Sequence, residues 1–413
     1  MNHTARAFVA ALVLVAASGR PALAPADVAT GKGSVRIGLL APASGPLAGD
    51  GGDVEAGLRY YLATHGDKLG GFSIEIRTGD EGATPEAAIA TTHQLVEQDA
   101  VDVIVGVLNS SNAYALAPYI DAQKKLLLIA GAGADELTQT QAQKTIFRVA
   151  HTSSQDVMPL GEYVCHRMHL RTAALVAADY AYGVEAAGGF ARGYTDSGCR
   201  VLQEQYGPRG SDWTSAVDKI DKRAQVVFAA VGAGDSVAFV SAYRAGGPKI
   251  ELTGDGDLTD ERSLPQERER ALGITTGCHY SAVVNNRDNV AFRLGYESLT
   301  GHTVSLFVEN GYVAAQTLAA ALDKQPPGAV KIDALLAALR GVQLNAPRGP
   351  VHFDKFQQIV NPVYIRRVRQ VGGRFRNEVI DTYPDVSQFW QYDPQRYLAL
   401  PPYSKLKGTW ARP

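Results

Sequence analysis

The sequence predicts an α/β protein made of two halves, each with a parallel sheet covered by helices. Short apolar runs of strand length alternate with stretches of helical periodicity up to residue 148, and the alternation starts again after Arg148. Strands that alternate with helices indicate parallel sheets covered on both faces. The 413 residues of the chain are also enough for two domains of ordinary size.

The first half contains segments of both kinds. Apolar runs of strand length lie at residues 35–40, 72–76, 101–107 and 126–130. Apolar residues recur at helical spacing over residues 54–62, 88–96 and 111–122. The turn residues Pro42, Gly45 and Pro46 end the first strand. This half therefore predicts one complete parallel sheet with its own helices.

The second half repeats the pattern and then changes it. Strand-like segments lie at residues 173–177, 200–205, 226–231 and 272–279. Helical periodicity covers residues 157–168, 184–195, 237–243, 289–299 and 308–322. Pro326, Pro327 and Gly328 interrupt the pattern before one more helix.

The C-terminal part predicts a strand meander followed by an irregular tail. The meander strands lie at residues 351–354, 363–368 and 375–380, and Gly372 and Gly373 supply a turn. From Asp381 onward the chain is rich in proline and aromatic residues. We expect this tail to wrap one lobe as packing rather than to form a ligand or partner site.

Composition excludes several classes of protein. Hydrophobic residues make up 46% and charged residues 20% of the chain, which is typical of a globular protein. The net charge is −2, and no long basic or acidic block occurs. Neither a nucleic-acid partner nor a lipid-facing surface is therefore expected.

The first residues have the pattern of a cleaved secretory signal. Arg6 precedes the apolar residues 7–17, and Ala22-Leu23-Ala24 offers a cleavage site. We expect a signal peptide at residues 1–24 and a mature chain that starts near Pro25 outside the cytoplasm. The alternative is an uncleaved anchor, but the apolar stretch is too short for a bilayer core of about 30 Å.

The three cysteines leave two alternatives open. Cys165 and Cys199 fall in the same predicted half, so one disulfide is possible in an oxidising compartment, and Cys278 is left over. Their spacing fits no zinc pattern. We favour the second alternative, three buried unpaired cysteines, because free cysteine usually behaves as a small buried residue.

Several short motifs, in this order along the chain, resemble one family. They are Ile37-Gly38-Leu39-Leu40 with Ser44-Gly45-Pro46, the loop 129–138, Phe147-Arg148, and Asp179-Tyr180-Ala181-Tyr182-Gly183. The resemblance is to the type I periplasmic binding proteins, in the branch of branched-chain amino acid and amide receptors of ABC importers. The segments 279–282, 347–350, 364–366 and 383–390 are similar to a sub-group whose members include binders of aromatic carboxylates.

The resemblance implies two doubly wound, Rossmann-like lobes joined by a three-strand hinge. The crossovers fall near residues 150, 279–280 and 349–350. Lobe one comprises residues 34–149 plus 281–349, lobe two residues 150–280 plus 350–400, and a tail residues 401–413. Ligand lies in the cleft between lobes that close by hinge motion. The implied partners are a small-molecule ligand and an ABC permease and ATPase complex, and the chain itself is expected to be a monomer.

Ligands of parallel sheets lie at the carboxyl ends of the strands, and polar residues follow two strands here. Asn109, Ser110 and Ser111 open a helix after one strand, where hydroxyls and free N–H groups suit a carboxylate. The alternative is that Asn109 or Ser110 only caps the helix. After the next strand, small residues let a ligand approach the backbone. These are Gly131, Ala132 and Ala134, and many members of the family carry Ser or Thr near the last.

Aromatic and acidic residues predict the other wall of the cleft. Tyr182 matches a tyrosine that faces the ligand in the family, and Tyr180 either joins it or packs in lobe two. Amino-acid binders place a carboxylate near Gly256, which is flanked here by Asp255 and Asp257. The anchor for an ammonium is thus missing or shifted. The remaining candidate ligand contacts are Leu47 and Tyr280.

The sequence therefore predicts a periplasmic binding protein and no enzyme. Motifs of serine hydrolases, phosphate-binding loops and zinc proteases are absent from the sequence, and we expect no metal ion and no cofactor. The expected ligand is a small carboxylate with an aromatic or apolar body. The alternatives are a branched-chain amino acid or amide, and a sensor that feeds a membrane receptor.

Overall fold

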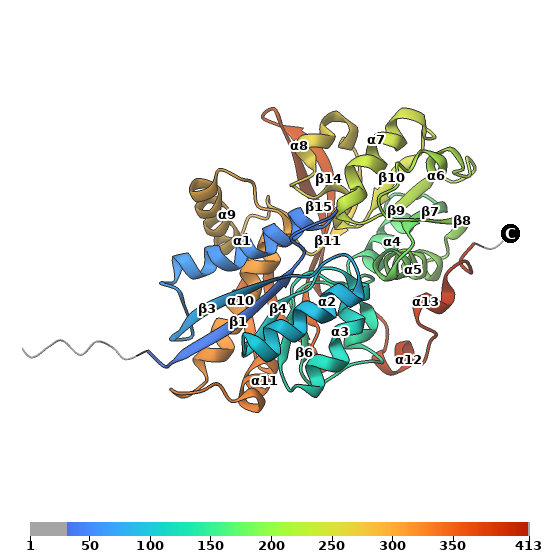
Figure 1. The fold of residues 1–413 in the computed structure, drawn as a ribbon. Coiled ribbons are helices and arrows are strands. Elements are labelled where there is room, and N and C mark those ends of the chain that lie inside the picture. Colours follow the sequence, from blue (N-terminus) through green and yellow to red (C-terminus); the bar gives the residue numbers. More distant parts are fainter. Residues whose placement is uncertain (1–30, 412–413) are drawn as a thin grey trace, which may run out of the picture.

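The computed structural model describes residues 31–411, so the predicted signal peptide lies outside the described residues. Two sheets organise this part of the chain, as Figure 1 shows. Among residues 31–411, no helix has the length and apolar character needed to cross a bilayer. The predicted α/β fold with two lobes is confirmed.

The first sheet has the strand order β2-β3-β1-β4-β5-β6. Its strands are β1 (Ser34–Ala41), β2 (Lys68–Leu69), β3 (Phe72–Asp80), β4 (Val103–Gly106), β5 (Leu126–Ile129) and β6 (Ile146–Arg148). All neighbours pair in parallel except β2 and β3. Successive strand residues point to opposite faces: Val103 and Val105 pack in one core, and Ile104 packs in another.

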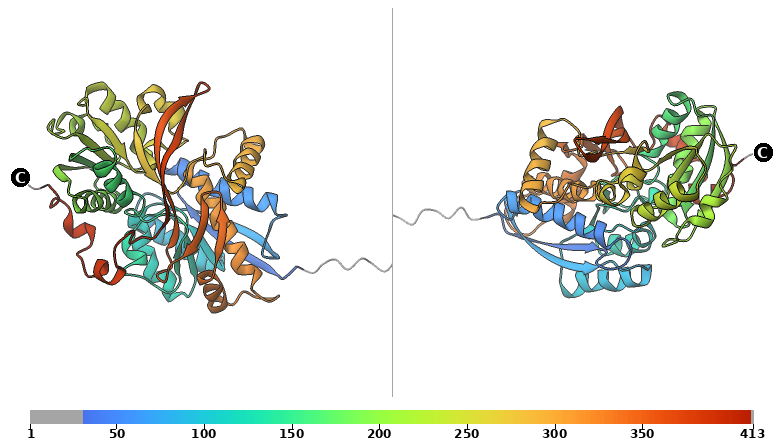
Figure 2. Two further views of the ribbon diagram at one scale, coloured as in Figure 1. Left: turned by 180° about the vertical axis from the view of Figure 1, so that it is seen from behind. Right: turned by 90° about the horizontal axis from the view of Figure 1, so that it is seen from above.

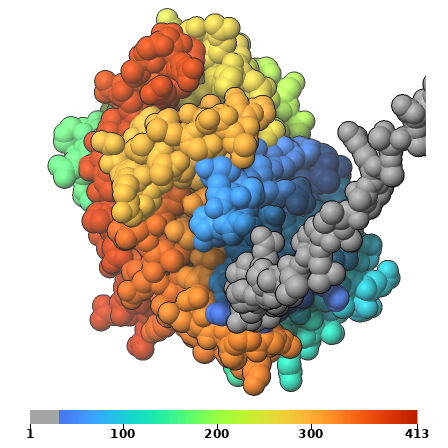
Figure 3. All heavy atoms as spheres, turned by 90° about the vertical axis from the view of Figure 1, so that its left-hand side faces the viewer, coloured from blue at the N-terminus to red at the C-terminus, as the bar shows by residue number. Residues whose placement is uncertain are grey.

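Helices from both ends of the chain cover this first sheet. One face carries α2 (Pro85–His93) and α3 (Ser110–Ala122), and the other carries α1 (Ala48–Thr64), α9 (Arg287–Thr300), α10 (Leu306–Asp323) and α11 (Ile332–Arg340). In Figure 3, α1 (blue) lies against the gold segment of α9. Tyr60 contacts Phe292 and Tyr296 there, with ring centroids 5.9 and 5.4 Å away. We call β1–β6 with these helices the first lobe.

The second sheet begins with five parallel strands in the order β8-β7-β9-β10-β11. These are β7 (Thr172–Ala178), β8 (Arg200–Gly207), β9 (Val226–Ala230), β10 (Glu251–Gly254) and β11 (Thr275–Cys278). One face carries α4 (Val157–His166) and α5 (Ala181–Asp196), and the other carries α6 (Thr214–Asp218), α7 (Ser236–Gly246) and α8 (Leu264–Glu267). We call these elements the second lobe.

Antiparallel strands extend the second sheet behind both lobes. They are β12 (Gln343–Ala346), β13 (Gly349–Phe353), β14 (Ile359–Val371) and β15 (Arg374–Val386). Strand β14 pairs with β13 near its start and with β11 and β15 further along, so the hairpin β14–β15 spans the two lobes (Figure 2, left). Val351 and Phe353 of β13 pack in the core of the first lobe.

A buried polar network joins three segments of the chain, around Val149, His279 and Arg348. Arg348 donates to the carbonyl of Val149 at 3.0 Å and to Asn310 Oδ1 at 2.6 Å. Asn310 Oδ1 also lies 3.1 Å from Nε2 of His279, whose Nδ1 lies 2.8 Å from Asp156 Oδ2. All these side chains are buried, so the network fixes the three segments relative to one another.

Two sequence predictions have clear outcomes here. The preference for three unpaired cysteines is wrong, because Cys165 and Cys199 form a disulfide with Cα atoms 6.0 Å apart; only Cys278 is a free, buried cysteine in residues 31–411. The end of α4 and the loop after α5 bring the two residues together. The tail packs as predicted, since Phe389, Tyr397 and Tyr403 form a cluster with Met158. It includes α12 (Pro394–Leu398) and α13 (Tyr403–Leu406).

Candidate functional site

The two lobes touch where the carboxyl ends of their strands face each other. A Cβ placed on Gly234, after β9, would lie 2.9 Å from Pro46, after β1. Arg262 of the second lobe lies 3.4 Å from Asp53 of α1. The loops that follow the strands of both sheets therefore meet along one line between the lobes, which we call the seam. The residues at this seam form what we call the strand-end site.

In the first lobe, the predicted serines and asparagine hold the loop ends together. Asn109 Oδ1 accepts a hydrogen bond from Ser111 N at 3.0 Å and so caps α3. Ser110 Oγ accepts one from Ala134 N at 3.1 Å, which ties the β4 loop to the β5 loop. The hydroxyl hydrogen of fully buried Ser110 and the side chain of half-buried Ser111 are not used in hydrogen bonds among residues 31–411.

The carboxylate of Glu81 already binds backbone N–H groups next to the start of α3. Glu81 is fully buried and accepts hydrogen bonds from Leu108 N at 2.8 Å and from Asn109 N at 2.9 Å. It also accepts one from Asn112 Nδ2 at 3.0 Å. Burial raises the pKa of Glu81 to about 7. The backbone N–H groups before α3 thus bind an internal carboxylate, so an external carboxylate would have to use the helix start itself.

The loop after β5 is packed tightly by small residues. Gly131, Ala132 and Ala134 are buried. A Cβ on Gly133 would lie 2.3 Å from Ser153 Oγ, and one on Gly131 would lie 2.7 Å from Leu108. These glycines are required because the first crossover and the β4 loop approach the backbone closely.

In the second lobe, Tyr182 and Asp255 form a buried pair. The hydroxyl of Tyr182 donates to Asp255 Oδ2 at 3.2 Å, and Asp255 Oδ1 accepts from Leu258 N at 3.1 Å. The ring of Tyr180 lies 6.0 Å from that of Tyr182, and the Arg209 guanidinium lies 4.6 Å above the Tyr180 ring. The predicted aromatic wall and one predicted acid are therefore neighbours.

Two further acids lie at this seam. Asp257 is buried, and its Oδ1 has no hydrogen-bond partner in the described part of the chain. Burial raises the pKa of Asp257 to about 6. Burial and the nearby charge of Asp257 raise the pKa of Asp50, in the first turn of α1, to about 8. Carboxylates from both lobes thus face one seam.

Leu47 follows Pro46 in the loop that reaches the second lobe, and it is half-buried against the core of the first lobe. One predicted residue, Tyr280, lies away from this group. Tyr280 is fully buried in the same core, and its hydroxyl donates to Asn289 Oδ1 at 2.9 Å. The structure therefore does not bring Tyr280 to the strand ends.

Sequence reasoning missed Asp50, Arg209 and His151. His151 is buried, stacks on His279 at 4.7 Å and lies 6.3 Å from the Tyr182 ring. Burial lowers its pKa to about 3, so the ring is neutral at pH 7, and its Nδ1 has no partner among residues 31–411. The one signal in the sequence for any of these three residues is the glycine-rich start of the helix around Asp50.

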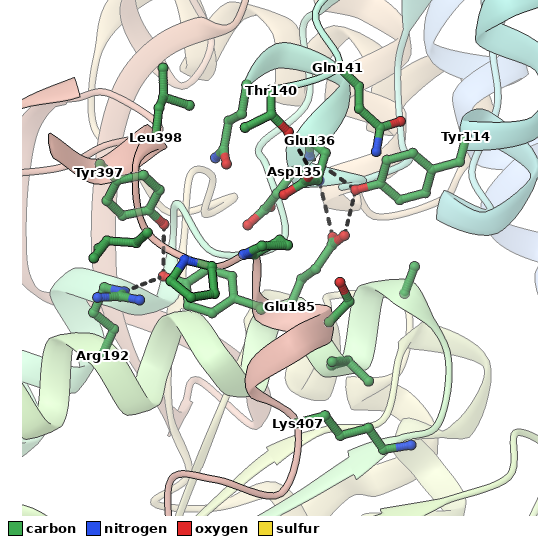
Figure 4. A pocket seen from close by; sticks show the side chains of 18 of the residues that line it. Tyr114, Asp135, Glu136, Thr140, Gln141, Glu185, Arg192, Tyr397, Leu398 and Lys407 are labelled. Carbon is green, nitrogen blue, oxygen red and sulfur yellow. Dashed lines mark hydrogen bonds between the residues drawn. The ribbon is translucent and has the colours of Figure 1, made fainter. Parts of the chain in front are cut away.

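A separate cavity of about 490 Å³ lies beside α3 and α5 (Figure 4). Glu185 of α5 accepts hydrogen bonds from Tyr114 Oη at 2.6 Å, Ser153 Oγ at 2.8 Å and Asp135 N at 3.1 Å. The tail forms the opposite wall. Of the predicted ligand contacts, only Tyr180 lines this cavity.

Two α/β lobes with strand ends facing one seam define the type I periplasmic binding fold. The chain belongs to the periplasmic binding protein family, whose family model matches residues 34–373. This is a family of solute-binding receptors, and the chain falls in its Leu/Ile/Val-binding branch. It is 27% identical over 359 residues to the Leu/Ile/Val-binding protein homolog 6 of Brucella melitensis, which covers 84% of this chain and 91% of that protein.

Solved structures of ABC transporter solute-binding proteins have the same fold. One from Rhodopseudomonas palustris BisB5, in complex with 3,4-dihydroxybenzoic acid, is 26% identical with a TM-score of 0.81 and covers 86% of this chain and 99% of that chain. Another from R. palustris, in complex with benzoate, is 27% identical with a TM-score of 0.81 and covers 86% and 97%. A substrate-binding protein from Sphaerobacter thermophilus is 28% identical with a TM-score of 0.80 and covers 86% and 99%.

Proposed function

We propose that this chain is the solute-capturing component of an ABC importer and that it binds a small aromatic carboxylate between its lobes. The observation that carries the proposal is the similarity, over 86% of the chain, to binding proteins solved with benzoate and 3,4-dihydroxybenzoic acid. We also propose that the protein works in the periplasm as a monomer, with a membrane permease and an ATPase as its partners; its membership of the periplasmic binding protein family supports the location.

The strand-end site offers partners for each part of such a ligand. The carboxylate would accept hydrogen bonds from Ser110 and Ser111 at the start of α3. The ring would lie against Tyr182. A ring hydroxyl would donate to the unpartnered Oδ1 of Asp257, which lies at the same seam in the opposite lobe. The proposal therefore favours a hydroxylated aromatic acid over an unsubstituted one.

Binding without turnover is part of this proposal. A hydrolase would need a nucleophile hydrogen bonded to a base. In residues 31–411, the buried His279 is hydrogen bonded through its ring nitrogens to Asp156 and Asn310 and to no serine or cysteine. These contacts suit a hinge that holds its shape while the lobes close, which we propose at the crossovers near residues 150, 279–280 and 349–350.

An amino acid is the second candidate, and Asp255 and Asp257 are the observation that favours it. Both carboxylates are buried near Tyr182, and one oxygen of Asp257 is unpartnered. A buried carboxylate pairs well with an ammonium group. The two candidate ligands differ in the group that donates a hydrogen bond to Asp257, which is a neutral hydroxyl in one and a charged ammonium in the other.

Calorimetry with three ligands and one substitution separates the candidates. The wild-type protein and Asp257→Asn are titrated with 4-hydroxybenzoate, benzoate and leucine. We expect 4-hydroxybenzoate to bind tightest and Asp257→Asn to weaken it by about tenfold, as loss of a charge-assisted hydrogen bond predicts, with benzoate unchanged. Exposed Asp333 on α11 supplies the control Asp333→Asn. Leucine binding tighter than both acids, and lost in Asp257→Asn, would establish the second candidate.

A further inference from the structure

Three buried side chains from two distant segments of the chain meet inside the protein. His151 and Asp156 lie between β6 and α4, and His279 follows β11. One ring nitrogen of each histidine and one carboxylate oxygen of Asp156 all lie within 4.8 Å of one another. The three residues are 5%, 2% and 0% exposed, in that order. Two imidazoles and a carboxylate therefore converge on one buried place.

The contacts of His279 bring a lone pair of its ring against a carboxylate. Its Nε2 lies 3.1 Å from Asn310 Oδ1, which also accepts a hydrogen bond from Arg348, so Nε2 carries the hydrogen and donates it. Burial and the Arg348 guanidinium hold the pKa of His279 well below its ordinary value, so the ring is neutral and its Nδ1 carries no hydrogen. This Nδ1 lies 2.8 Å from Asp156 Oδ2. Two acceptors at this distance repel each other, so the contact needs a positive charge, either a proton or a metal ion.

Two further acceptor positions in the cluster are unused. Asp156 Oδ1 and His151 Nδ1 are buried and have no hydrogen-bond partner in the described part of the chain. The other carboxylate oxygen, Asp156 Oδ2, accepts a hydrogen bond from the backbone N–H of His279 at 2.8 Å, which fixes the carboxylate in place. The His151 ring stacks on the His279 ring with centroids 4.7 Å apart. Buried lone pairs without a donor are rare in proteins, and a metal ion is one partner that satisfies them.

The buried arginines nearest the cluster have carboxylate partners of their own. Arg348 pairs with Glu309, and Arg366 lies 3.7 Å from Glu261. Among residues 31–411, the carboxylate of Asp156 lies within ion-pair distance of His279 alone. The negative charge of Asp156 is therefore not neutralised by an arginine, and it is the charge that a cation at this place would meet.

The donor set indicates the kind of metal ion. Magnesium and calcium bind oxygen ligands, whereas imidazole nitrogens suit zinc and similar transition metals. Zinc lies about 2.0–2.2 Å from nitrogen and oxygen ligands, which places tetrahedral ligands about 3–3.5 Å from one another. Ligand atoms that lie within 4.8 Å reach this spacing through side-chain rotation. No short motif in the sequence reveals the set, because the two histidines are far apart along the chain.

We propose that His151, Asp156 and His279 bind one zinc ion through a nitrogen of each imidazole and through Asp156 Oδ1. The ion takes the place of the positive charge that the contact between His279 and Asp156 requires. It fastens the segment before α4 to the segment after β11, and its burial gives it a structural role. The sequence-based expectation of no metal rested on short motifs, which a site of this kind does not have. The site stands independently of the solute proposed for the strand ends.

Zinc itself is the probe. The mature wild-type chain, His151→Gln, Asp156→Asn and the control His93→Gln are unfolded, stripped with a chelator and refolded with zinc, so that the ion reaches the ligands before they are buried. The control removes an exposed histidine that lies 2.7 Å from Glu97, a surface pair that also offers zinc ligands. After gel filtration, mass spectrometry of the metal is expected to find one zinc ion per chain in wild type and control. The two ligand variants should retain about tenfold less zinc.

A second measurement follows the ion and the fold together. Cobalt(II) in place of zinc should give the visible absorption of a tetrahedral site in wild type and in His93→Gln, and this absorption should be lost in His151→Gln. Stripping the metal should lower the melting temperature of the wild type and leave that of His151→Gln unchanged. These readouts do not depend on which solute binds at the strand ends.

Two results would overturn the proposal. A folded wild type that retains no zinc after refolding would show that a proton occupies the contact between His279 and Asp156. Equal zinc content in wild type and His151→Gln would assign the metal to surface histidines. If Asp156→Asn does not fold, His151→Gln and the cobalt spectrum carry the test, because the His151 ring makes no hydrogen bond through its Nδ1 that the substitution would break.

Discussion

The hydroxyl of Tyr114 donates to Glu185 at 2.6 Å, and this contact joins α3 of the first lobe to α5 of the second. Glu185 keeps two other donors, Ser153 and Asp135 N, when Tyr114 is changed. We expect Tyr114→Phe to weaken lobe closure without unfolding either lobe. The affinity for 4-hydroxybenzoate should fall by two- to tenfold, corresponding to about 0.5–1.5 kcal/mol, as calorimetry would measure.

The control for this prediction is Tyr119→Phe. Tyr119 lies on the same helix, and its hydroxyl donates to Glu97 at 2.9 Å within the first lobe. Its loss should leave affinity unchanged. Equal effects of the two substitutions would show that Tyr114 acts only on the stability of α3.

Closure should be linked to a proton on Asp50. Burial and the charge of Asp257 raise its pKa to about 8, and Asp53 acts in the same direction, while Arg262 and Arg209 act in the opposite one. Asp257 and both arginines belong to the second lobe, so opening would return the pKa toward its ordinary value near 4. Between these values the closed form binds more protons than the open one, so closure weakens as pH rises through 8.

Small-angle scattering of the ligand-free protein measures this linkage. The radius of gyration is expected to be larger at pH 9 than at pH 6. In Asp50→Asn, which carries no titrating group there, the difference should disappear. A radius that is larger at pH 6, or an undiminished change in the substituted protein, would contradict the assignment to Asp50.

The disulfide between Cys165 and Cys199 should stabilise the second lobe and leave ligand binding intact. It closes a loop with a sequence separation of 34 residues, far from the strand ends. Replacing both cysteines by serine should lower the free energy of unfolding by about 2–4 kcal/mol, measured by denaturant titration. A reducing agent should destabilise the wild type and have no further effect on the double variant. Equal stability of the two proteins would show that the bond is absent in solution.

The hinge network makes a prediction about Arg348. Its guanidinium is fully buried and pairs with Glu309, so removing it leaves an uncompensated carboxylate. We expect Arg348→Met to cost about 3–5 kcal/mol of stability, as removal of one partner of a buried ion pair does. The paired change Arg348→Met with Glu309→Leu should recover a large part of that loss in thermal unfolding. No recovery in the double variant would point to the other bonds of Arg348, to Val149 and Asn310.

The sequence predicted the regular elements well because their signal is local. The strand at 126–130 and the helix at 111–122 follow directly from apolar runs and helical spacing, and the structure has β5 and α3 there. The short strand Ile146–Arg148 was missed because three residues carry too little pattern. The pairing of Cys165 with Cys199 depends on two segments meeting in space, which spacing alone does not reveal.

The candidate site was predicted less completely, for a similar reason. Tyr182 and Asp255 could be named because the resemblance to the family points to their loops, and in the structure these loops follow β7 and β10. Tyr280 follows the strand β11 as well, yet its ring turns into the core of the first lobe. Asp50 and His151 come near the seam only because the two lobes touch. No pattern in the sequence predicts that contact.

A crystal structure of the protein grown with 4-hydroxybenzoate tests the central claim most directly. The account predicts density for the acid between the lobes at the strand ends, with its carboxylate at Ser110 and Ser111, its ring on Tyr182 and its hydroxyl at Asp257. Density for the acid in another place, or an empty strand-end site under conditions where leucine fills it with its ammonium on Asp255 or Asp257, would contradict the account.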